Sequence, residues 1–358
     1  MLIVRSPVRI SFAGGGTDLP AYYERFGGAV LSTAINKYFY TILCKRRDGR
    51  IQVISSDLRI FETWHDIATM QIRGSGLDIP LAVLKDLACD VSVDLFLSSE
   101  IPPGTGLGSS ASVCVNILKT LTTYLDLPLS KYDLAERAFY IARNVLGRHA
   151  GRQDEFAAAF GGFNFITFGT DGFTEVQPVD VDSEMLQELP ARLMLFFTGS
   201  ARNSGTILEE QEKLTTSQTG PAVEALHEVR SLADRMLAAL GCRNLALFGS
   251  LLHEGWQAKK RISGRISNPR IDHLYELALR NGASGGKITG AGGGGFLLLY
   301  CEPECQEGVR SALHAEGIQD MAFAFDNNGA QVVVNDPFID GDERTGSRWI
   351  FTPAASMA

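Results

Sequence analysis

The chain has 358 residues, of which 45% are hydrophobic and 21% are charged, so it has ordinary globular composition and the length of about two domains. Its formal net charge of −8 argues against a nucleic-acid-binding protein, because such proteins usually carry a strongly basic face. No stretch approaches the ~18 apolar residues that span a bilayer. Arg5 and Arg9 interrupt the N-terminal apolar run, which therefore does not resemble a signal peptide. The six cysteines form no zinc pattern, and we expect reduced thiols in a cytoplasmic protein.

The first half of the chain is rich in predicted strands. β-Branched and aromatic residues indicate strands within 2–14, 38–45 and 50–56, and residues 91–99 alternate between apolar and polar side chains. Apolar residues at helical spacing then predict helices over 109–124 and 131–146, followed by a strand at 163–168.

The second half is mostly helical between its strands. We expect a strand at 192–199, a loop followed by two strands within 285–301, and two further strands near 320–326 and 330–334. The expected helices cover roughly 204–216, 221–240, 243–262, 270–280 and 304–316. The segment 185–192 separates the halves, so we predict domains over 1–188 and 189–334, and a tail over 335–358 that has no periodicity.

Residues 102–112, "PPGTGLGSSAS", lie between a predicted strand and a predicted helix. The first amides of a helix have no partner within the helix and attract anions. Gly104, Gly106 and Gly108 would allow a ligand to approach the backbone, while Ser109, Ser110 and Ser112 add hydroxyl donors and a candidate metal ligand. The loop has no lysine and is therefore not a Walker A loop. A flexible glycine-serine connection remains the alternative for this stretch taken alone.

Two further glycine clusters, "SFAGGGTDLP" (11–20) and "KITGAGGGGF" (287–296), also adjoin predicted strands. Together the three stretches resemble the three motifs of the GHMP kinases, named for galactose, homoserine, mevalonate and phosphomevalonate kinases. "PPGTGLGSSA" matches the family's Pro-x-x-x-Gly-Leu-Gly-Ser-Ser-Ala loop at every fixed position. The resemblance covers roughly residues 1–334. "AGGGTDLPAYY", "GRQDEFAAAFGGFN" and "GAGGGGFLLLY" are most similar to the sugar-kinase branch, above all to the D-glycero-D-manno-heptose 7-phosphate kinases.

The resemblance implies an α+β protein of two domains, with a ribosomal-protein-S5-like N-terminal domain, an α/β (ferredoxin-like) C-terminal domain and the active cleft between them. It implies ATP as phosphoryl donor, Mg²⁺ as metal and the anomeric hydroxyl of a sugar phosphate as acceptor. We therefore expect a sugar phosphate and ATP as partners, without nucleic acid or membrane, and leave a homodimer open. No base-reading motif separates adenine from guanine.

The resemblance also assigns roles to individual residues. Asp154 corresponds to the aspartate that accepts the proton of the sugar hydroxyl, and Arg9 to an arginine that helps this hydroxyl ionise. The phosphates of the nucleotide would contact Gly104, Gly106, Leu107, Gly108, Ser109, Ser110 and Ala111, with Ser110 also binding the metal. The expected substrate-binding residues are Gly15, Gly16, Thr17, Asp18, Arg202, Gly292 and Gly293. Each of these residues also has a purely structural alternative. Asp154 could be an aspartate at a helix start, Arg9 an anchor at a strand edge, Asp18 part of an Asx-turn and Ser110 an N-cap.

Basic residues are candidates for binding the phosphate that the acceptor already carries. Arg202 follows a predicted strand and precedes a predicted helix, where free amides would also meet an anion. Lys259, Lys260, Arg261 and Arg265 are weaker candidates, because a basic run on a helix is usually a solvated face. Lys287 adjoins the third glycine cluster and could face either ligand.

One departure from the family pattern concerns the metal. Related kinases carry a metal-binding glutamate on the helix before the catalytic aspartate, but here Ala142 stands at that position and Asn144 at a nearby position that is often acidic. Mg²⁺ is normally held by one or two carboxylates together with substrate phosphates. Two alternatives therefore stay open. One is a kinase for an unphosphorylated sugar or a mevalonate-like alcohol, and the other is a family member that binds its ligands without turning them over.

Overall fold

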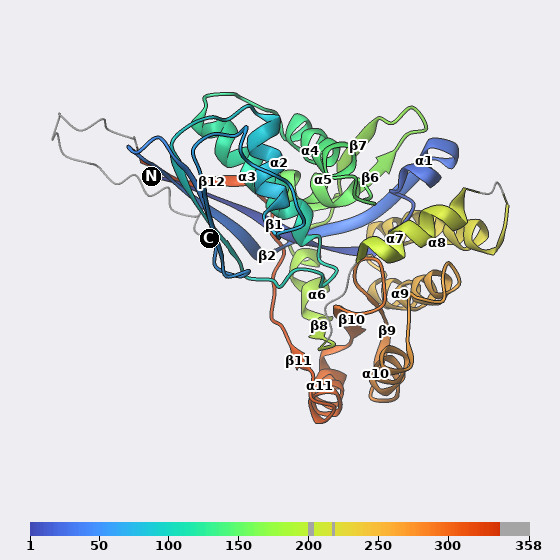
Figure 1. Cartoon of the computed structure of the whole chain (residues 1–358). Coiled ribbons are helices and arrows are strands. Elements are labelled where there is room, and N and C mark those ends of the chain that lie inside the picture. Colours follow the sequence, from blue (N-terminus) through green and yellow to red (C-terminus); the bar gives the residue numbers. More distant parts are fainter. Residues whose placement is uncertain (200–203, 217–218, 337–358) are drawn as a thin grey trace.

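The computed structural model describes residues 1–199, 204–216 and 219–336. Arg202 and most of the predicted tail, residues 337–358, lie outside the described residues. Over the described part, the chain forms an eight-stranded sheet and a four-stranded sheet, with helices packed around and between them (Figure 1).

The first sheet has the strand order β12-β1-β2-β5-β3-β4, and β6 and β7 extend it from β2. All of its strand pairs are antiparallel except β3 with β5. Its strands are β1 (Leu2–Ala13), β2 (Gly28–Lys45), β3 (Ile51–Ser55), β4 (Ile60–Trp64), β5 (Val93–Ser99), β6 (Phe163–Phe168), β7 (Thr174–Pro178) and β12 (Gln331–Asn335).

The helices of the first half are α1 (Pro20–Phe26), α2 (Asp78–Asp86), α3 (Ser109–Tyr124), α4 (Lys131–Tyr140), the π-helical turn η1 (Ile141–Val145) and α5 (Gln153–Phe160). Of these, α3 and α5 contact β1 and β2 of the sheet, whereas α1 contacts the second half of the chain. The apolar stripe predicted for α3 is buried at Ile117, Leu118 and Leu121, in a cluster with Phe156 of α5 and Leu95 of β5. This packing fixes the N-termini of α3 and α5 relative to β1.

The second sheet has the order β11-β8-β10-β9, and all its pairs are antiparallel. Its strands are β8 (Leu193–Phe197), β9 (Ala283–Ile288), β10 (Phe296–Cys301) and β11 (Gln319–Asp320). The helices of this half are α6 (Met185–Ala191), α7 (Ser204–Thr215), α8 (Pro221–Gly241), α9 (Leu245–Lys260), α10 (Pro269–Arg280), the 3₁₀ turn η2 (Pro303–Cys305) and α11 (Gln306–Ala315).

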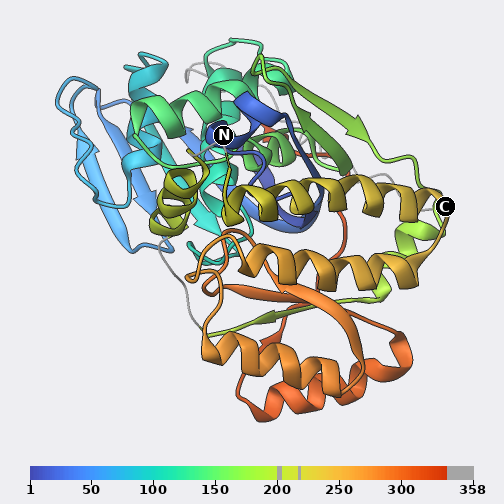
Figure 2. The same cartoon turned by 90° about the vertical axis from the view of Figure 1, so that its right-hand side faces the viewer.

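The long helices α8 and α9 lie side by side between the two sheets (Figure 2). One buried cluster joins them to both sheets, since it contains Phe12 of β1, Leu226 of α8, Phe248 of α9 and Leu298 of β10. The backbone of α9 approaches β9 so closely that a Cβ at Gly285 would lie 2.1 Å from the Gly249 carbonyl oxygen. The two halves therefore share a continuous core, which holds the cleft between them in a defined shape.

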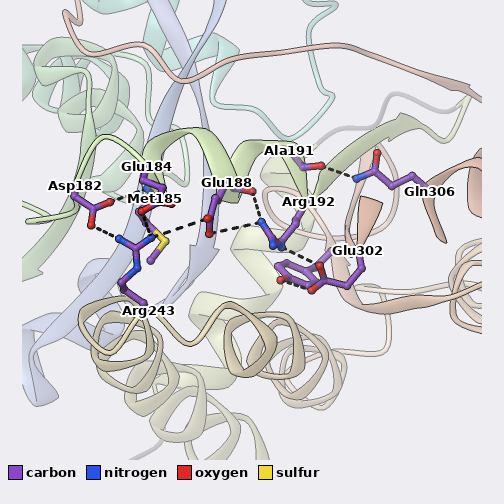
Figure 3. A network of polar contacts seen from close by, with 10 residues as sticks. Asp182, Glu184, Met185, Glu188, Ala191, Arg192, Arg243, Glu302 and Gln306 are labelled. Carbon is purple, nitrogen blue, oxygen red and sulfur yellow. Dashed lines mark hydrogen bonds and ion pairs between the residues drawn. The ribbon is translucent and has the colours of Figure 1, made fainter. Parts of the chain in front are cut away.

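A polar network surrounds α6, at the segment where we predicted the boundary (Figure 3). Arg243, just beyond α8, is ion-paired with Asp182 and with Glu184. At the other end of α6, Arg192 Nε donates to Glu302 Oε2 at 2.9 Å, and Gln306 Nε2 donates to the Ala191 carbonyl at 2.6 Å. These contacts attach the connecting helix to the second half of the chain.

Several expected elements differ in extent. The strand expected over 38–45 is the end of β2, which begins at Gly28 because its first half pairs with both β1 and β6. The helix expected over 131–146 is α-helical only to Tyr140 and then becomes the π-helical turn η1.

The segment expected as a strand over 320–326 contributes only Gln319–Asp320 to the second sheet, because it then crosses to the first. The Met321 amide still donates to Leu195 at 2.7 Å, whereas Phe325 already forms a bridge with Ile35 of β2. The chain then continues into β12, which pairs with β1, so residues 331–335 of the second half lie in the first sheet.

Candidate active site

The glycine loop at 102–108 ends at an uncapped helix start. Gly104, Gly106 and Gly108 have φ values of 76°, 84° and 77°, a region that favours glycine. Gly108 is the N-cap of α3, and no side chain caps the helix from that position. The first amides of α3 are thus directed to a site where an anion would satisfy them.

The glycine loop and the third glycine cluster pack against each other. A Cβ on Gly106 would lie 2.4 Å from the Thr289 carbonyl oxygen, and one on Gly290 would lie 2.6 Å from Gly106 Cα. The Phe296 amide donates to the Thr105 carbonyl at 3.2 Å. These two glycine clusters, about 180 residues apart in sequence, therefore form one wall of the site.

Arg9 and Asp154 form an ion pair beside this wall. Arg9 Nε donates to Asp154 Oδ1 at 2.7 Å, and Arg9 Nη1 donates to the Gly106 carbonyl at 2.7 Å. The arginine is 4% exposed, whereas Asp154 is 26% exposed at the surface of the cleft. Asp154 lies in the first turn of α5, where the amides also favour a carboxylate. The arrangement leaves the carboxylate accessible and fixes its orientation.

A first cavity lies between the two halves of the chain and opens to solvent, with an empty volume of about 780 Å³. The first half lines it with Arg9, Ser11, Gly15, Gly16, Asp18, Leu19, Gly104, Gly106, Gly108, Ser109, Ser110, Gly151, Gln153 and Asp154, and the second half with Leu208, Gln211, Lys259, Lys287, Gly290 and Ala291. Ser11 Oγ and Gln153 Oε1 are buried and lack a hydrogen-bond partner among the described residues. A ligand with several hydroxyl groups would satisfy them.

Asp18 is held at the base of this cavity. The Gly16 amide donates to its Oδ1 at 2.8 Å, and Gln153 Nε2 donates to its Oδ2 at 3.0 Å. The carboxylate lies so close to Gly151 that a Cβ there would be 2.0 Å from Oδ2. Burial, with a contribution from the Asp154 charge, raises the pKa of Asp18 above its usual value.

Two lysines of the second half face the first cavity. Lys287 of β9 donates to the Phe12 carbonyl at 3.1 Å, and burial, with a contribution from Arg9, lowers its pKa from 10.5 to about 7. Lys259 of α9 is 4% exposed and donates to the Gly290 carbonyl. Of the basic run on α9, Lys259 thus reaches the cavity, whereas Lys260, Arg261 and Arg265 are ion-paired with Asp272, Glu228 and Glu210.

A second cavity adjoins the first at Gly104, Ser110, Gly151, Asp154 and Leu208. Its further lining comes from α2, α3, η1, the segment 146–150, α5 and α7, namely Ile79, Ala111, Cys114, Ala142, Leu146, Gly147, Arg148, His149, Ala150, Glu155 and Gly205. Arg148 has no ion-pair partner within the described ranges. Sequence reasoning missed this residue, because a loop arginine carries no periodic signal.

A third cavity continues from the second past Ser110, Ile79 and Arg148, and it is mainly apolar. Leu58, Leu77, Leu97, Ile101 and Val113 contribute to its walls. The three cavities together form a continuous cleft that is polar at one end and apolar at the other, with the start of α3 at its centre.

Most of the predicted site residues lie on this cleft, and four lie behind its walls. Thr17 donates to the Gly14 carbonyl at 2.8 Å and so closes the loop between β1 and α1, while Leu107 is buried in the core. A Cβ on Gly292 would clash with Ile266, and the Gly293 amide donates to the Ile266 carbonyl at 2.6 Å. These residues support the walls of the cleft. Ser110 is not an N-cap, since α3 begins at Ser109 after Gly108.

The oxygen ligands available for a metal lie in the second cavity. Ser110 and Asp154 line it together with Glu155, whose Oε2 is buried and unpartnered within the described chain. No group of three or more His, Cys, Asp or Glu side chains among the described residues could hold a metal ion alone. A cation here would therefore need phosphate oxygens as further ligands, as Mg²⁺ does in nucleotide sites. The residues fit such an ion.

A cleft that combines helix-start amides, an oriented carboxylate–guanidinium pair and a polar acceptor cavity has what phosphoryl transfer to a hydroxyl requires. The fold and the site thus define a class, the phosphotransferases that act on an alcohol group. Models of the GHMP kinases N terminal domain and the GHMP kinases C terminal match residues 78–162 and 222–319. The D-glycero-alpha-D-manno-heptose 7-phosphate kinase of Campylobacter jejuni is 34% identical over 326 residues, which cover 89% of this chain and 95% of that protein. The chain belongs to the GHMP kinase family.

Further relatives agree with this membership. A solved D-glycero-D-manno-heptose 1-phosphate kinase from Bacteroides thetaiotaomicron superposes with a TM-score of 0.78 at 29% identity, covering 93% of this chain and 98% of that one. The L-fucokinase/L-fucose-1-P guanylyltransferase of Bacteroides fragilis is 26% identical over 350 residues, 86% of this chain but only 35% of that protein. The family and the two-domain fold expected from the three glycine motifs are confirmed.

Within the described residues, none of the helices combines the length and the apolar character needed to cross a bilayer.

Proposed function

We propose that the protein transfers the γ-phosphoryl group of ATP to the anomeric hydroxyl of D-glycero-D-manno-heptose 7-phosphate, which gives the 1,7-bisphosphate. The observation that carries this proposal is the position of the Arg9–Asp154 pair. Asp154 borders both the polar first cavity and the second cavity over α3. An acceptor hydroxyl in one cavity and a triphosphate in the other would meet at this carboxylate.

The first cavity suits a sugar. Asp18 can accept hydrogen bonds from hydroxyl groups, and the unpartnered Ser11 Oγ and Gln153 Oε1 offer further polar contacts. Sites built to bind hydroxyl groups discriminate strongly against analogues without them, because their buried polar atoms are then left unpaired. A small, wholly apolar alcohol would leave Ser11 Oγ and Gln153 Oε1 unsatisfied.

The acceptor's own phosphate would be bound by Lys259 and Lys287, which come from the second half of the chain and line the first cavity. The negative charge of the phosphate would favour the protonated form of Lys287. The relatives described above include a heptose 7-phosphate kinase and a heptose 1-phosphate kinase. Both support a phosphorylated heptose as the acceptor. Arg202, which we also predict to bind this phosphate, lies outside the described residues.

The nucleotide would extend from the second cavity into the third. The triphosphate would meet the α3 amides, the Ser110 hydroxyl and the Arg148 guanidinium, which supply donors and positive charge in place of a Walker lysine. The apolar third cavity is suited to a purine base. Mg²⁺ held by Ser110 and Asp154 would neutralise charge on the transferring phosphoryl group.

Asp154 would then act on the acceptor. Its ion pair with Arg9 orients the carboxylate, which can accept the proton of the attacking hydroxyl. Arg9 would also favour the ionised form of that hydroxyl by its charge. The six free cysteines support a reducing compartment, and we propose the cytoplasm as the site of the reaction.

An acceptor panel tests this function. ADP release is measured with heptose 7-phosphate, heptose 1-phosphate, the free heptose, fucose, galactose and mevalonate, and the product is identified by ³¹P NMR. We expect the highest kcat/KM with heptose 7-phosphate and a new anomeric phosphate in the product. The variant Lys259→Ala should raise KM for the phosphorylated heptose and leave that for the free heptose unchanged, with Lys260→Ala on the same helix as control. Equal kcat/KM for fucose or mevalonate would contradict the proposal.

A further inference from the structure

Glu155 is an unusual buried carboxylate. It is 3% exposed, lies in the first turn of α5 directly after Asp154, and lines the second cavity. Its Oε2 atom has no hydrogen-bond partner among the described residues. A buried carboxylate without a partner is costly, so its retention in a core needs a reason.

The surroundings of Glu155 do not supply a structural reason. Burial raises the pKa of Glu155 well above its usual value, and the charges of Asp154 and Asp18 raise it further. Glu136 of α4 shows how the same fold stabilises a half-buried carboxylate, since Arg152 Nη1 donates to its Oε1 at 2.7 Å. Glu155 has no comparable counter-ion in the described parts of the chain. Asp154 and Glu155 line the second cavity together with Ser110, and a cation bound there would be a counter-ion for Glu155.

Ala142 also lines the second cavity, at the position where the family pattern expects an acidic residue. It lies in the π-helical turn η1, and its methyl group leaves this wall of the cavity without a ligand atom. Single π-helical turns are frequently found at functional sites. Ser110 and Asp154 line the same cavity as Glu155 and Ala142.

We infer that Glu155 is the second carboxylate ligand of the divalent cation that accompanies the nucleotide, and that it replaces the acidic group absent at Ala142. The inference extends the proposed function and rests on it, because it assumes that a nucleotide binds in the second cavity. With Glu155, the cavity offers two carboxylates and one hydroxyl, and the remaining positions fall to phosphate oxygens and water, which is the ligand set that Mg²⁺ prefers. In this chain the carboxylate ligand would therefore come from Glu155 of α5, because Ala142 of η1 has no carboxylate.

Mn²⁺ binding tests this assignment directly. Electron paramagnetic resonance measures the uptake of Mn²⁺ by the protein with a non-hydrolysable ATP analogue, in the absence of any acceptor. We expect Glu155→Gln to weaken Mn²⁺ binding at least ~10-fold, because losing even an outer-shell partner of a metal ligand costs this much. Glu136→Gln, the same change on the neighbouring helix, should leave Mn²⁺ affinity unchanged.

Thermal unfolding and a second variant separate metal binding from a structural role. Without metal, Glu155→Gln should be at least as stable as the wild type, since glutamine has nearly the shape of glutamate and adds no charge to the core. The double variant Ala142→Glu with Glu155→Gln should recover Mn²⁺ binding. Unchanged Mn²⁺ affinity in Glu155→Gln would overturn the inference, as would a loss accompanied by a lower Tm and no recovery in the double variant.

The acceptor does not enter this measurement. If the acceptor panel fails while Glu155→Gln loses Mn²⁺, the identity of the sugar is wrong and the metal ligand stands. If the wild type takes up no Mn²⁺ with the ATP analogue, both the inference and the nucleotide site are wrong.

Discussion

Arg9 joins Asp154 to the glycine loop, since its Nε donates to Asp154 Oδ1 and its Nη1 to the Gly106 carbonyl, both at 2.7 Å. One buried guanidinium thus fixes the carboxylate of α5 relative to the loop that precedes α3. Movement of the loop would be transmitted to the carboxylate. The two contacts join Arg9 to residues that are 145 and 97 positions away in the sequence. Together they set the geometry on which the proposed reaction depends.

The substitution Asp154→Asn should remove the proton acceptor and leave the helix-start amides that bind the phosphates intact. We expect kcat to fall by roughly 10²- to 10⁴-fold, the range for loss of a general base, while the dissociation constant of an ATP analogue, measured without divalent metal, stays within about twofold. Steady-state kinetics and calorimetry measure the two quantities. Asp234→Asn, an exposed residue of α8, serves as control. A variant with wild-type kcat would exclude Asp154 as the base.

Arg148→Ala should mainly affect the nucleotide. Because its guanidinium lines both the second and the third cavity, its loss removes a charge-assisted contact of about 1.5–3 kcal/mol. KM for ATP should then rise at least ~10-fold, with little change in KM for the acceptor. Arg137→Ala, on the nearby helix α4 and paired with Asp86, should change neither constant. If Arg148→Ala changed KM for the acceptor but not KM for ATP, the triphosphate would bind away from Arg148.

Gly106→Ala tests the contact between the two glycine clusters. The new Cβ would lie 2.4 Å from the Thr289 carbonyl oxygen, at a φ of 84° that alanine rarely adopts. We expect the free energy of unfolding to fall by about 1–3 kcal/mol and KM for ATP to rise. Gly241→Ala at the end of α8 meets no atom within 4 Å and should change stability by less than about 1 kcal/mol. Equal stabilities of the two variants would show that the clusters are not in contact.

Lys287 should make stability depend on pH. Its pKa is about 7 in the folded chain and 10.5 ordinarily, so between these values the unfolded chain binds one more proton. The free energy of unfolding should therefore rise with pH over this window, by up to ~1.4 kcal/mol per unit, and level off below pH 7, where both states are protonated.

The variant Lys287→Met lacks this contribution. Denaturation at pH 6, 7.5 and 9 should show it more stable than the wild type at low pH, with the difference shrinking as pH rises. Lys213→Met, whose lysine is 72% exposed on α7, should keep the wild-type slope. If the free energy of unfolding changed with pH equally in the wild type and in Lys287→Met, the lowered pKa of Lys287 would be wrong.

The sequence predicted the parts of the fold that depend on local pattern. The apolar stripe of α3 and the alternation of 91–99 are reproduced, because each reflects burial of one face of a single element. The full length of β2 and the return of β12 to β1 were not predicted, since they depend on partners far along the chain. The short length of β11 was not predicted for the same reason. Residues 321–325 cross from the second sheet to the first, where Phe325 pairs with Ile35.

The candidate site was predictable where a motif defines it. Arg9, Asp18, Ser110 and Asp154 all line the cleft, as the resemblance to the family implies. The motifs do not separate residues that line the cleft from those that support it, and Thr17 is an example of the second kind. Arg148 and Glu155 were not predicted, because their position on the second cavity becomes visible only in three dimensions.

A crystal structure with a non-hydrolysable ATP analogue and heptose 7-phosphate tests the central claim most directly. The account predicts the γ-phosphate beside Ser110 and the α3 amides, and the anomeric hydroxyl of the heptose between that phosphate and Asp154. A triphosphate bound away from the start of α3, or an anomeric hydroxyl out of reach of Asp154, would contradict it.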